Sequence, residues 1–225
     1  MAMQSSTFLK IKQILWKEIT TEMRTRSSLG TLLMFSLTTL AAVSMSIGSQ
    51  RLAPEFLAVL FWIILFFSSM AGLPRVFLQE SDAGTLLTLR LYASSQAVFF
   101  GKFFYNLLLL LILVLFLLPL FLIFLNADIY APGMLCLLLL LGIIGLAAAT
   151  TLIAALITQV QNQGTLFTIL SFPVLLPLLL LCIQLTTETL LPGAAVTQNR
   201  LLFLASYDLV LLGIASILFD YLWYD

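Results

Sequence analysis

Long uninterrupted runs of apolar residues dominate this chain. Six of them reach the length of about 20 residues that a helix needs to cross about 30 Å of hydrocarbon. They cover 29–48, 54–73, 103–125, 131–157, 165–185 and 201–223. Leu, Phe and Ile occupy all sides of these runs instead of alternating with polar residues, which favours helices over barrel strands. The pattern predicts an all-α integral membrane protein with six transmembrane helices in a single domain over 1–225.

A different pattern precedes the first predicted span. Between residues 7 and 22, Phe8, Ile11, Leu15 and Ile19 recur every three or four positions, and Lys and Glu occupy the positions between them. This period predicts an amphipathic helix that lies on the membrane surface, with its basic side toward anionic headgroups. The helix either anchors the first span only, or is an elbow helix that also contacts a cytoplasmic partner.

The segment 75–102, between the second and third spans, is the longest one inside the chain that is not a predicted span. A plain connector between helices needs only about 2–8 residues. Glu80 and Asp82 precede Gly84, which permits a sharp turn, and the residues around Arg90 predict a short helix. Acids in this position favour the N-terminus of that helix, where backbone N–H groups are unpaired. We therefore expect a docking surface for a soluble partner.

Two prolines lie inside the fifth predicted span. Pro173 and Pro177 are four residues apart, and each removes one helical hydrogen bond and clashes with the preceding turn. The spacing predicts a broken or kinked helix, whose freed carbonyl groups need neighbours or water as partners. The kink is either a static device for packing or a bend that moves when a path opens.

One acid lies inside a predicted span. Asp208 is about seven residues into the sixth span, roughly 10 Å deep at 1.5 Å per residue. Acids at such depth are costly and usually face a bundle interior or water. Arg200 and Arg51 lie near the same membrane boundary and are its candidate partners. Two interpretations remain open: a functional acid, or one that reaches out to the boundary.

The amino-acid composition narrows the functional classes to which this chain can belong. Hydrophobic residues make up 62% of the 225 and charged residues only 9%, against about 25% charged in a soluble domain. A cytosolic enzyme and a disordered chain are therefore excluded. The chain has no His, which excludes His-ligated haem, His-bound zinc and His-based triads within it. No motif indicates an enzyme or a metal site.

The two cysteines and the one Gly-Lys pair indicate no further chemistry. Cys136 and Cys182 lie in apolar runs near the outer ends of the fourth and fifth spans. A bridge between them is an alternative to two free thiols, which are the commoner case. Gly101 and Lys102 are followed by Phe103, and position 96 is Gln, so the phosphate-binding loop of ATPases is missing.

The distribution of charge predicts the orientation. Ten Lys and Arg balance ten Asp and Glu. Eight of the ten basic residues lie before the first span or in 75–102, and only Arg51 and Arg200 lie on the other side. Because basic loops stay in the cytoplasm, both termini are expected to be cytoplasmic. The first residues contain acids and no A-x-A site, so we expect no cleavable signal.

The layout as a whole resembles the ABC-2-type permeases, and more narrowly the haem exporter protein B family of the cytochrome c maturation system. The resemblance covers nearly the full length and rests on three patches in order. They are Arg75, Phe77, Glu80 and Gly84-Thr85-Leu86; Gly101-Lys102; and Phe172-Pro173 through Pro177-Leu178-Leu179.

The resemblance implies a permease subunit in the bacterial inner membrane. A separate cytoplasmic ATPase would bind the ATP and dock on the elbow helix and on a coupling helix in 75–102. The implied coupling residues are Arg75, Phe77, Glu80, Asp82, Gly84, Leu86, Arg90 and Lys102. Other implied partners are haem-handling membrane subunits, a haem chaperone, a second permease copy and the lipid bilayer, with no nucleic acid. Haem is the candidate cargo, and with no His in this chain a partner must supply strong haem ligation.

Three alternatives remain open at this point. The chain either carries haem itself or transmits force that releases the loaded chaperone. The second alternative is that the chain is an ABC-2 permease for a lipid or polysaccharide. The third belongs to a different functional class: a membrane scaffold that does not transport and works without an ATPase.

Overall fold

The computed structural model describes residues 2–48, 50–157, 163–193 and 198–224. Its helices are α1 (Ala2–Thr25), α2 (Ser27–Ile47), α3 (Pro54–Gly72), α4 (Arg75–Asp82), α5 (Leu86–Tyr92), α6 (Ser95–Leu125), α7 (Pro132–Ile157), α8 (Gln163–Leu190) and α9 (Gln198–Tyr224). Over the described residues, six helices are long and apolar enough to cross a membrane. The predicted all-α membrane architecture is therefore confirmed.

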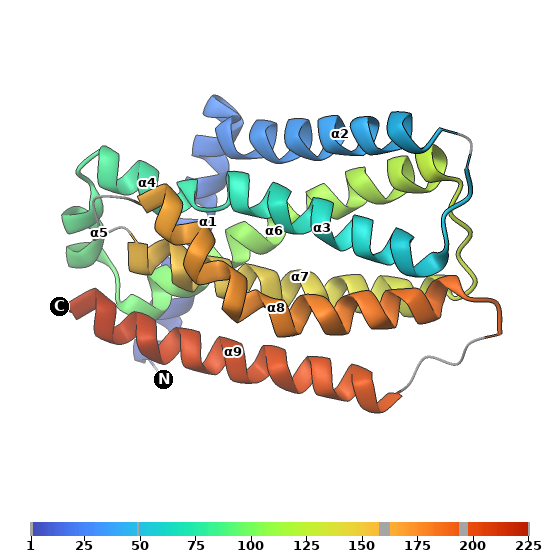
Figure 1. The fold of residues 1–225 in the computed structure, drawn as a ribbon. Helices are drawn as coiled ribbons and strands as arrows, with labels where there is room; N and C mark the ends of the chain where they lie inside the picture. The colour runs from blue at the N-terminus through green and yellow to red at the C-terminus, as the bar shows by residue number, and fades with distance from the viewer. Residues whose placement is uncertain (1, 49, 158–162, 194–197, 225) are drawn as a thin grey trace.

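The long helices run side by side, and the polar elements gather at one end of the bundle (Figure 1). Helices α4 and α5 lie at this end together with the C-terminus, and α1 crosses the bundle there. Helices α2, α6 and α8 end at the opposite end of the bundle, and α3, α7 and α9 begin there. The short helices α4 and α5 thus lie at only one of the two ends.

The observed spans agree closely with the apolar runs, with two marked differences. Helix α6 begins at Ser95, not at 103 as predicted. Its first two turns carry Lys102 and several small or polar residues, which look like a loop in a hydropathy pattern. Ala97, Val98 and Phe99 are fully buried, so protein rather than lipid surrounds these turns. Helix α8 likewise extends to Leu190, beyond the predicted end at 185.

The centre of the bundle is packed around Trp62 and α7. Trp62 of α3 is fully buried, and its indole Nε1 donates a hydrogen bond to Thr186 Oγ1 of α8 at 2.8 Å. A Cβ atom at Gly142 of α7 would overlap the Trp62 ring and lie 3.1 Å from Cys182 Sγ. Small residues allow such close approach between membrane helices, so Gly142 lets α3, α7 and α8 meet.

The double proline bends α8 without breaking it. Pro173 and Pro177 both lie inside the continuous helix, and Figure 1 shows that α8 is bent part-way along its length. Between the two prolines, the Val174 carbonyl accepts a hydrogen bond from the Tyr207 hydroxyl of α9 at 2.7 Å. This contact joins α9 to the bent part of α8; the carbonyls freed by the prolines are those four residues before each of them, and Val174 is not one of these.

The alternative of a disulfide bridge is wrong. Cys136 and Cys182, both within the described residues, are free thiols. Cys182 is fully buried beside Gly142, whereas Cys136 is exposed on the outside of α7. The two side chains face different environments, although their helices pack against each other.

The contact between Gly142 and Trp62 yields a stability prediction. We expect Gly142→Ala to lower stability by about 1–3 kcal/mol, because overpacking a tight core forces its neighbours apart. The matched control is Gly133→Ala in the first turn of α7, where an added Cβ would have nothing within 4 Å. Thermal melting of the purified variants in detergent measures both effects. Equal melting temperatures for the two variants would contradict the close approach of α3 and α7.

Candidate coupling site

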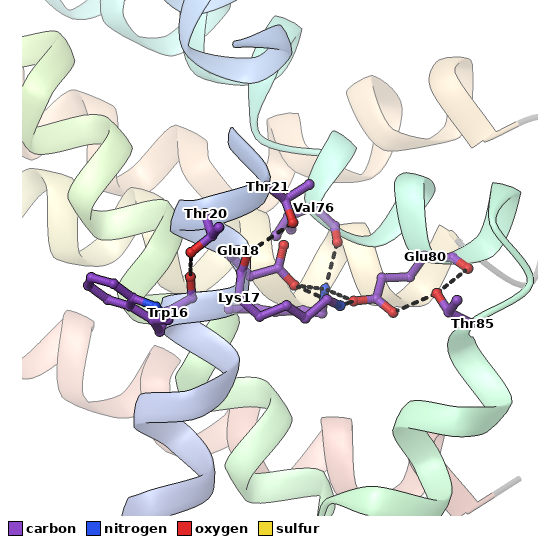
Figure 2. Close-up of polar contacts among 9 residues, drawn as sticks. Trp16, Lys17, Glu18, Thr20, Thr21, Val76, Glu80 and Thr85 are labelled. Carbon is purple, nitrogen blue, oxygen red and sulfur yellow. Dashed lines mark hydrogen bonds and ion pairs between the residues drawn. The ribbon is translucent and has the colours of Figure 1, made fainter. Parts of the chain in front are cut away.

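Four charged side chains meet where α1, α4 and α6 come together. Lys102 of α6 is fully buried, and its Nζ lies 3.0 Å from Glu18 Oε1 of α1 and 3.4 Å from Glu80 Oε1 of α4. Lys17 Nζ forms a second ion pair with Glu80 Oε1. Figure 2 shows Lys17, Glu18 and Glu80 pointing toward one another. We call Lys17, Glu18, Glu80 and Lys102 the ion cluster.

Further hydrogen bonds hold Lys102 and Glu80 of the ion cluster. The Lys102 ammonium donates to the Val76 carbonyl at 2.6 Å, a contact across from α6 to α4. The Thr85 hydroxyl donates to Glu80 Oε2 at 3.1 Å (Figure 2). Two positive and two negative charges balance, which a buried group of charges requires. The structure therefore places Glu80 and Lys102 in the interior as a neutral, hydrogen-bonded set.

Phe77 closes the cluster on one side. Its ring centroid lies 4.6 Å from Lys102 Nζ, a distance at which the ring face attracts a cation. The Phe77 ring also contacts Phe219 of α9, with centroids 5.9 Å apart. The aromatic side chains exclude water, and this strengthens the ion pairs relative to an exposed setting.

The positions of the charges follow from helix geometry. Ile14, Glu18 and Glu22 are four residues apart on α1 and lie on one face of that helix; all three are buried. A Cβ atom at Gly101 of α6 would lie 2.7 Å from Ile14 Cγ2. Gly101 thus permits the close approach of α1, and the next residue, Lys102, meets Glu18. Gly101 and Lys102 together thus hold α6 against α1.

Glu22 continues this contact toward α2. Its Oε2 accepts a hydrogen bond from the Tyr105 hydroxyl of α6 at 3.0 Å. Its Oε1 accepts from the Leu29 backbone N–H of α2 at 2.8 Å, which is one of the donors that a helix leaves unpaired at its start. One carboxylate therefore connects α1, α2 and α6.

Helix α5 connects α1 to the end of α9. The Tyr92 hydroxyl donates to Gln13 Oε1 of α1 at 2.5 Å, and Lys10 Nζ donates to the Tyr92 carbonyl at 2.9 Å. Arg90 lies over the Trp223 ring of α9, 5.5 Å from its centroid. The acidic end of the chain has a role here too, because Asp220 accepts a hydrogen bond from the Ser95 hydroxyl at the start of α6.

The structure changes the expected role of the acids in 75–102. Glu80 and Asp82 do not lie at the N-terminus of the short helix that follows them; they form the last turn of α4. Gly84 has φ +66°, as the predicted turn requires. Helix α5 then begins at Leu86, whose side chain lies outside the described residues. The N-terminal role predicted for Glu80 is wrong because ion partners on other helices hold it.

Protein covers the predicted apolar face of α1 only in part, and the placement of this face on the membrane surface stays a prediction. Phe8 is exposed, and Ile11, Leu15 and Ile19 are only half-buried. The face of α1 that packs against the rest of the protein carries Glu18 and Glu22, which a search for apolar positions alone leaves out. The signal available in the sequence was the four-residue spacing of Glu18 and Glu22, which continues from Ile14 and marks the buried face.

What remains exposed between α4 and α5 is a small surface. Its residues are Asp82, Gly84, Thr85, Thr88 and Leu91, which we call the α4–α5 tip. The Leu91 side chain is 89% exposed. Arg75 is half-buried at the start of α4. The tip combines one acid with one apolar side chain, as a protein-binding surface does.

Asp208 does not pair with the predicted arginines. Arg200 contacts Glu188 at 2.7 Å, and Arg51 lies 4.0 Å from Asp128. Asp208 is buried in α9 against Gly145 of α7, and within the described part of the chain neither carboxylate oxygen has a hydrogen-bond partner. The acid faces the bundle interior because α7 offers it room at a glycine.

The chain matches a known protein family. A family model described as CcmB protein matches residues 9–219, a range that contains the ion cluster, the α4–α5 tip and both prolines of α8. No curated protein matches the chain. Nor do the described residues contain a group of three or more Cys, Asp or Glu side chains that could hold a metal ion.

The ion cluster predicts unequal roles for its two lysines. We expect Lys102→Met to destabilise the protein by about 3–5 kcal/mol, because it leaves Glu18 and Glu80 buried with too little opposing charge. Lys17→Met should cost less, because the Lys17 side chain is 49% exposed and Lys102 remains beside Glu80. Melting temperatures in detergent compare the two.

A rescue variant separates charge from shape. Lys102→Met leaves Lys17 to balance both Glu18 and Glu80. Adding Glu18→Gln removes the one negative charge left in excess, so we expect part of the lost stability to return. Two lysine variants with the same melting temperature, or a double variant no better than Lys102→Met alone, would show that the ion cluster does not stabilise this end.

Proposed function

We propose the function of this chain from the family to which it belongs, the CcmB protein family. Family membership makes it the permease subunit of an ABC transporter in cytochrome c maturation. The six long apolar helices of the described residues fit a multi-pass protein of the inner membrane. The proposal concerns how this subunit is driven and what it moves.

The partner ATPase docks on the α4–α5 tip in this proposal. Leu91 supports it, because a largely exposed leucine outside the spans gains most when another protein covers it. Asp82 and Thr88 beside it supply polar contacts at the rim. Glu80 and Lys102 play no part in docking, because both are buried in the ion cluster.

The ion cluster carries the motion of the tip to the spans. Lys102 between Glu18 and Glu80 is the observation on which this step rests, because it fixes α4 to α1 and α6 at once. Through Arg90 and Trp223, α5 adds a connection to α9. ATP binding closes the ATPase subunits, moves the tip, and shifts these helices as one packed body, since close-packed interfaces do not deform gradually.

The proposed orientation places both termini in the cytoplasm. Eight of the ten basic residues support it, because they lie before the first span or in 75–102. The gathering of α1, α4, α5 and the C-terminus at one end of the bundle is consistent with this (Figure 1). The ATPase then meets the end that carries the α4–α5 tip.

Haem is the proposed cargo, either exported or released outside the membrane with its loaded chaperone. A chain without His offers no strong axial ligand, so haem-handling membrane subunits supply ligation. A second permease copy pairs with this one, since an ATPase dimer presents two equal docking sites. ATP is bound by the partner and not by this chain.

Affinity purification from a native membrane tests the proposal as a whole. The tagged chain should co-purify with an ATP-binding subunit and with haem-handling membrane proteins. A preparation with glycosyltransferases in their place would indicate an ABC-2 permease for a polysaccharide. A preparation without any ATPase would indicate a scaffold and overturn the transport role.

The docking surface predicts a specific pair of variants. Asp82→Lys and Leu91→Ser change exposed side chains, so we expect both to insert and fold normally but to retain about tenfold less ATPase, the equivalent of 1.4 kcal/mol. Asp128→Lys is the matched control, an exposed acid outside this surface. Pull-down of the ATPase from detergent extracts provides the measurement, and undiminished recovery with Leu91→Ser would refute docking at the tip.

The bend in α8 predicts a defect in turnover and not in assembly. Replacing Pro173 and Pro177 with Leu restores two helical hydrogen bonds and removes the cause of the bend. Both prolines are exposed, so the variant should assemble with its ATPase but mature c-type cytochromes more slowly. Pro119→Leu, an exposed proline inside α6, is the control. A wild-type yield of c-type cytochromes in the double variant would show that the bend serves packing only.

A further inference from the structure

A groove opens on the side of the bundle where α1 turns into α2. It encloses about 500 Å³ and lies between α1, α2 and α6. Most of its walls are apolar. The main wall residues are Ile19, Met23, Leu29, Leu33, Leu109 and Ile112. Helices α2 and α6 belong to the apolar spans, so this groove faces the bilayer.

Two charged residues complete the lining, and they differ in what they are free to bind. Glu22 is occupied, because Tyr105 and the Leu29 N–H both donate to its carboxylate. Arg26 is exposed, and among the described residues no acid forms an ion pair with it. The mouth of an apolar groove is therefore marked by an arginine whose positive charge has no acid partner within the described part of the chain.

We propose that this groove binds one phospholipid with an anionic headgroup. The acyl chain lies along the apolar walls, and the phosphate accepts hydrogen bonds from the Arg26 guanidinium. Arginine matches phosphate because its planar fork donates two hydrogen bonds at once. A lipid is the occupant because the groove is apolar over most of its surface and opens where the bilayer supplies lipid at high local concentration.

The backbone at Arg26 adds to the argument. Arg26 has φ +50° and ψ +26°, a left-handed conformation that is strained for a residue with a side chain and costs Gly little. The position thus carries an arginine where glycine would be easier to accommodate. This also supplies a clean variant, because Arg26→Gly removes the guanidinium and eases the backbone strain.

The bound lipid would brace the junction of α1 and α2. The groove touches Ile19, Glu22 and Leu29, and Glu22 is the carboxylate that connects α1, α2 and α6. This inference does not depend on the transport role. It needs only a chain that lies in a bilayer.

Native mass spectrometry of the full-length chain in detergent tests the proposal. The probes are dioleoylphosphatidylglycerol, which is anionic, and dioleoylphosphatidylcholine, which carries no net charge. We expect the wild type to retain one phosphatidylglycerol about fivefold more strongly than phosphatidylcholine, the effect of about one basic residue near a headgroup. Arg26→Gly should lose this preference and keep or raise the melting temperature measured without lipid.

Two matched controls locate the site. Arg24→Gln removes a neighbouring exposed arginine that does not line the groove, and it should keep most of the preference. Gly30→Phe fills the groove, because Gly30 lines it and an added Cβ there has open space, so the strong binding of the first phosphatidylglycerol should be lost. Gly133→Phe, equally open but elsewhere on the chain, should bind as the wild type does.

Three outcomes would overturn the proposal. The first is equal retention of the two lipids by the wild type. The second is an equal loss of preference in Arg24→Gln and Arg26→Gly, which would indicate general attraction to positive charge. The third is undiminished binding of the first phosphatidylglycerol by Gly30→Phe.

Discussion

The buried ammonium group of Lys102 constrains the whole end of the bundle where the polar helices gather. A lysine shielded from water is stable only when acids and acceptors surround it, and no single helix can supply them. Glu18 comes from α1, while Glu80 and the Val76 carbonyl come from α4. The need to satisfy Lys102 therefore brings α1 across the bundle and folds α4 back against α6. Gly101 provides the room for this arrangement, since a side chain there would meet Ile14.

The rest of the bundle is held together by close packing of apolar side chains, with few polar contacts. Between residues 145 and 155 every residue of α7 is buried, and small side chains bring the neighbouring helices close. Trp62 fills the space beside Gly142 and satisfies its one polar atom through Thr186. In a membrane there is little hydrophobic drive for helices to associate, so tight packing must replace it. Interactions thus differ along the bundle, with ion pairs at the end that carries the short helices and close apolar contact through the middle.

This division explains what the sequence could predict. Six spans follow from composition, because any helix that crosses hydrocarbon must be apolar along its length. The turn at Gly84 follows from one residue type. Which charges face inward does not, because Glu80 looks the same in the sequence whether it meets water or Lys102, and its partners are 22 and 63 residues away. The same limit applies to Asp208, whose neighbour Gly145 lies on another helix.

The pairing inside the ion cluster also limits how a force applied at the α4–α5 tip can travel. If α4 slid along α6 by even part of a turn, Glu80 would leave Lys102 while both stayed away from water. A broken buried pair costs about 3–5 kcal/mol, so such sliding is unfavourable compared with a movement that keeps every pair intact. In the proposed mechanism the movement of lowest energy is a rotation of α1, α4 and the first turns of α6 as one unit. Glu22, through the Leu29 N–H, and Arg90, over the Trp223 ring, are the contacts that would pass it to α2 and α9. The charges that suggest a docking surface in the sequence lie instead in the ion cluster beneath the proposed docking surface, where they would make it rigid.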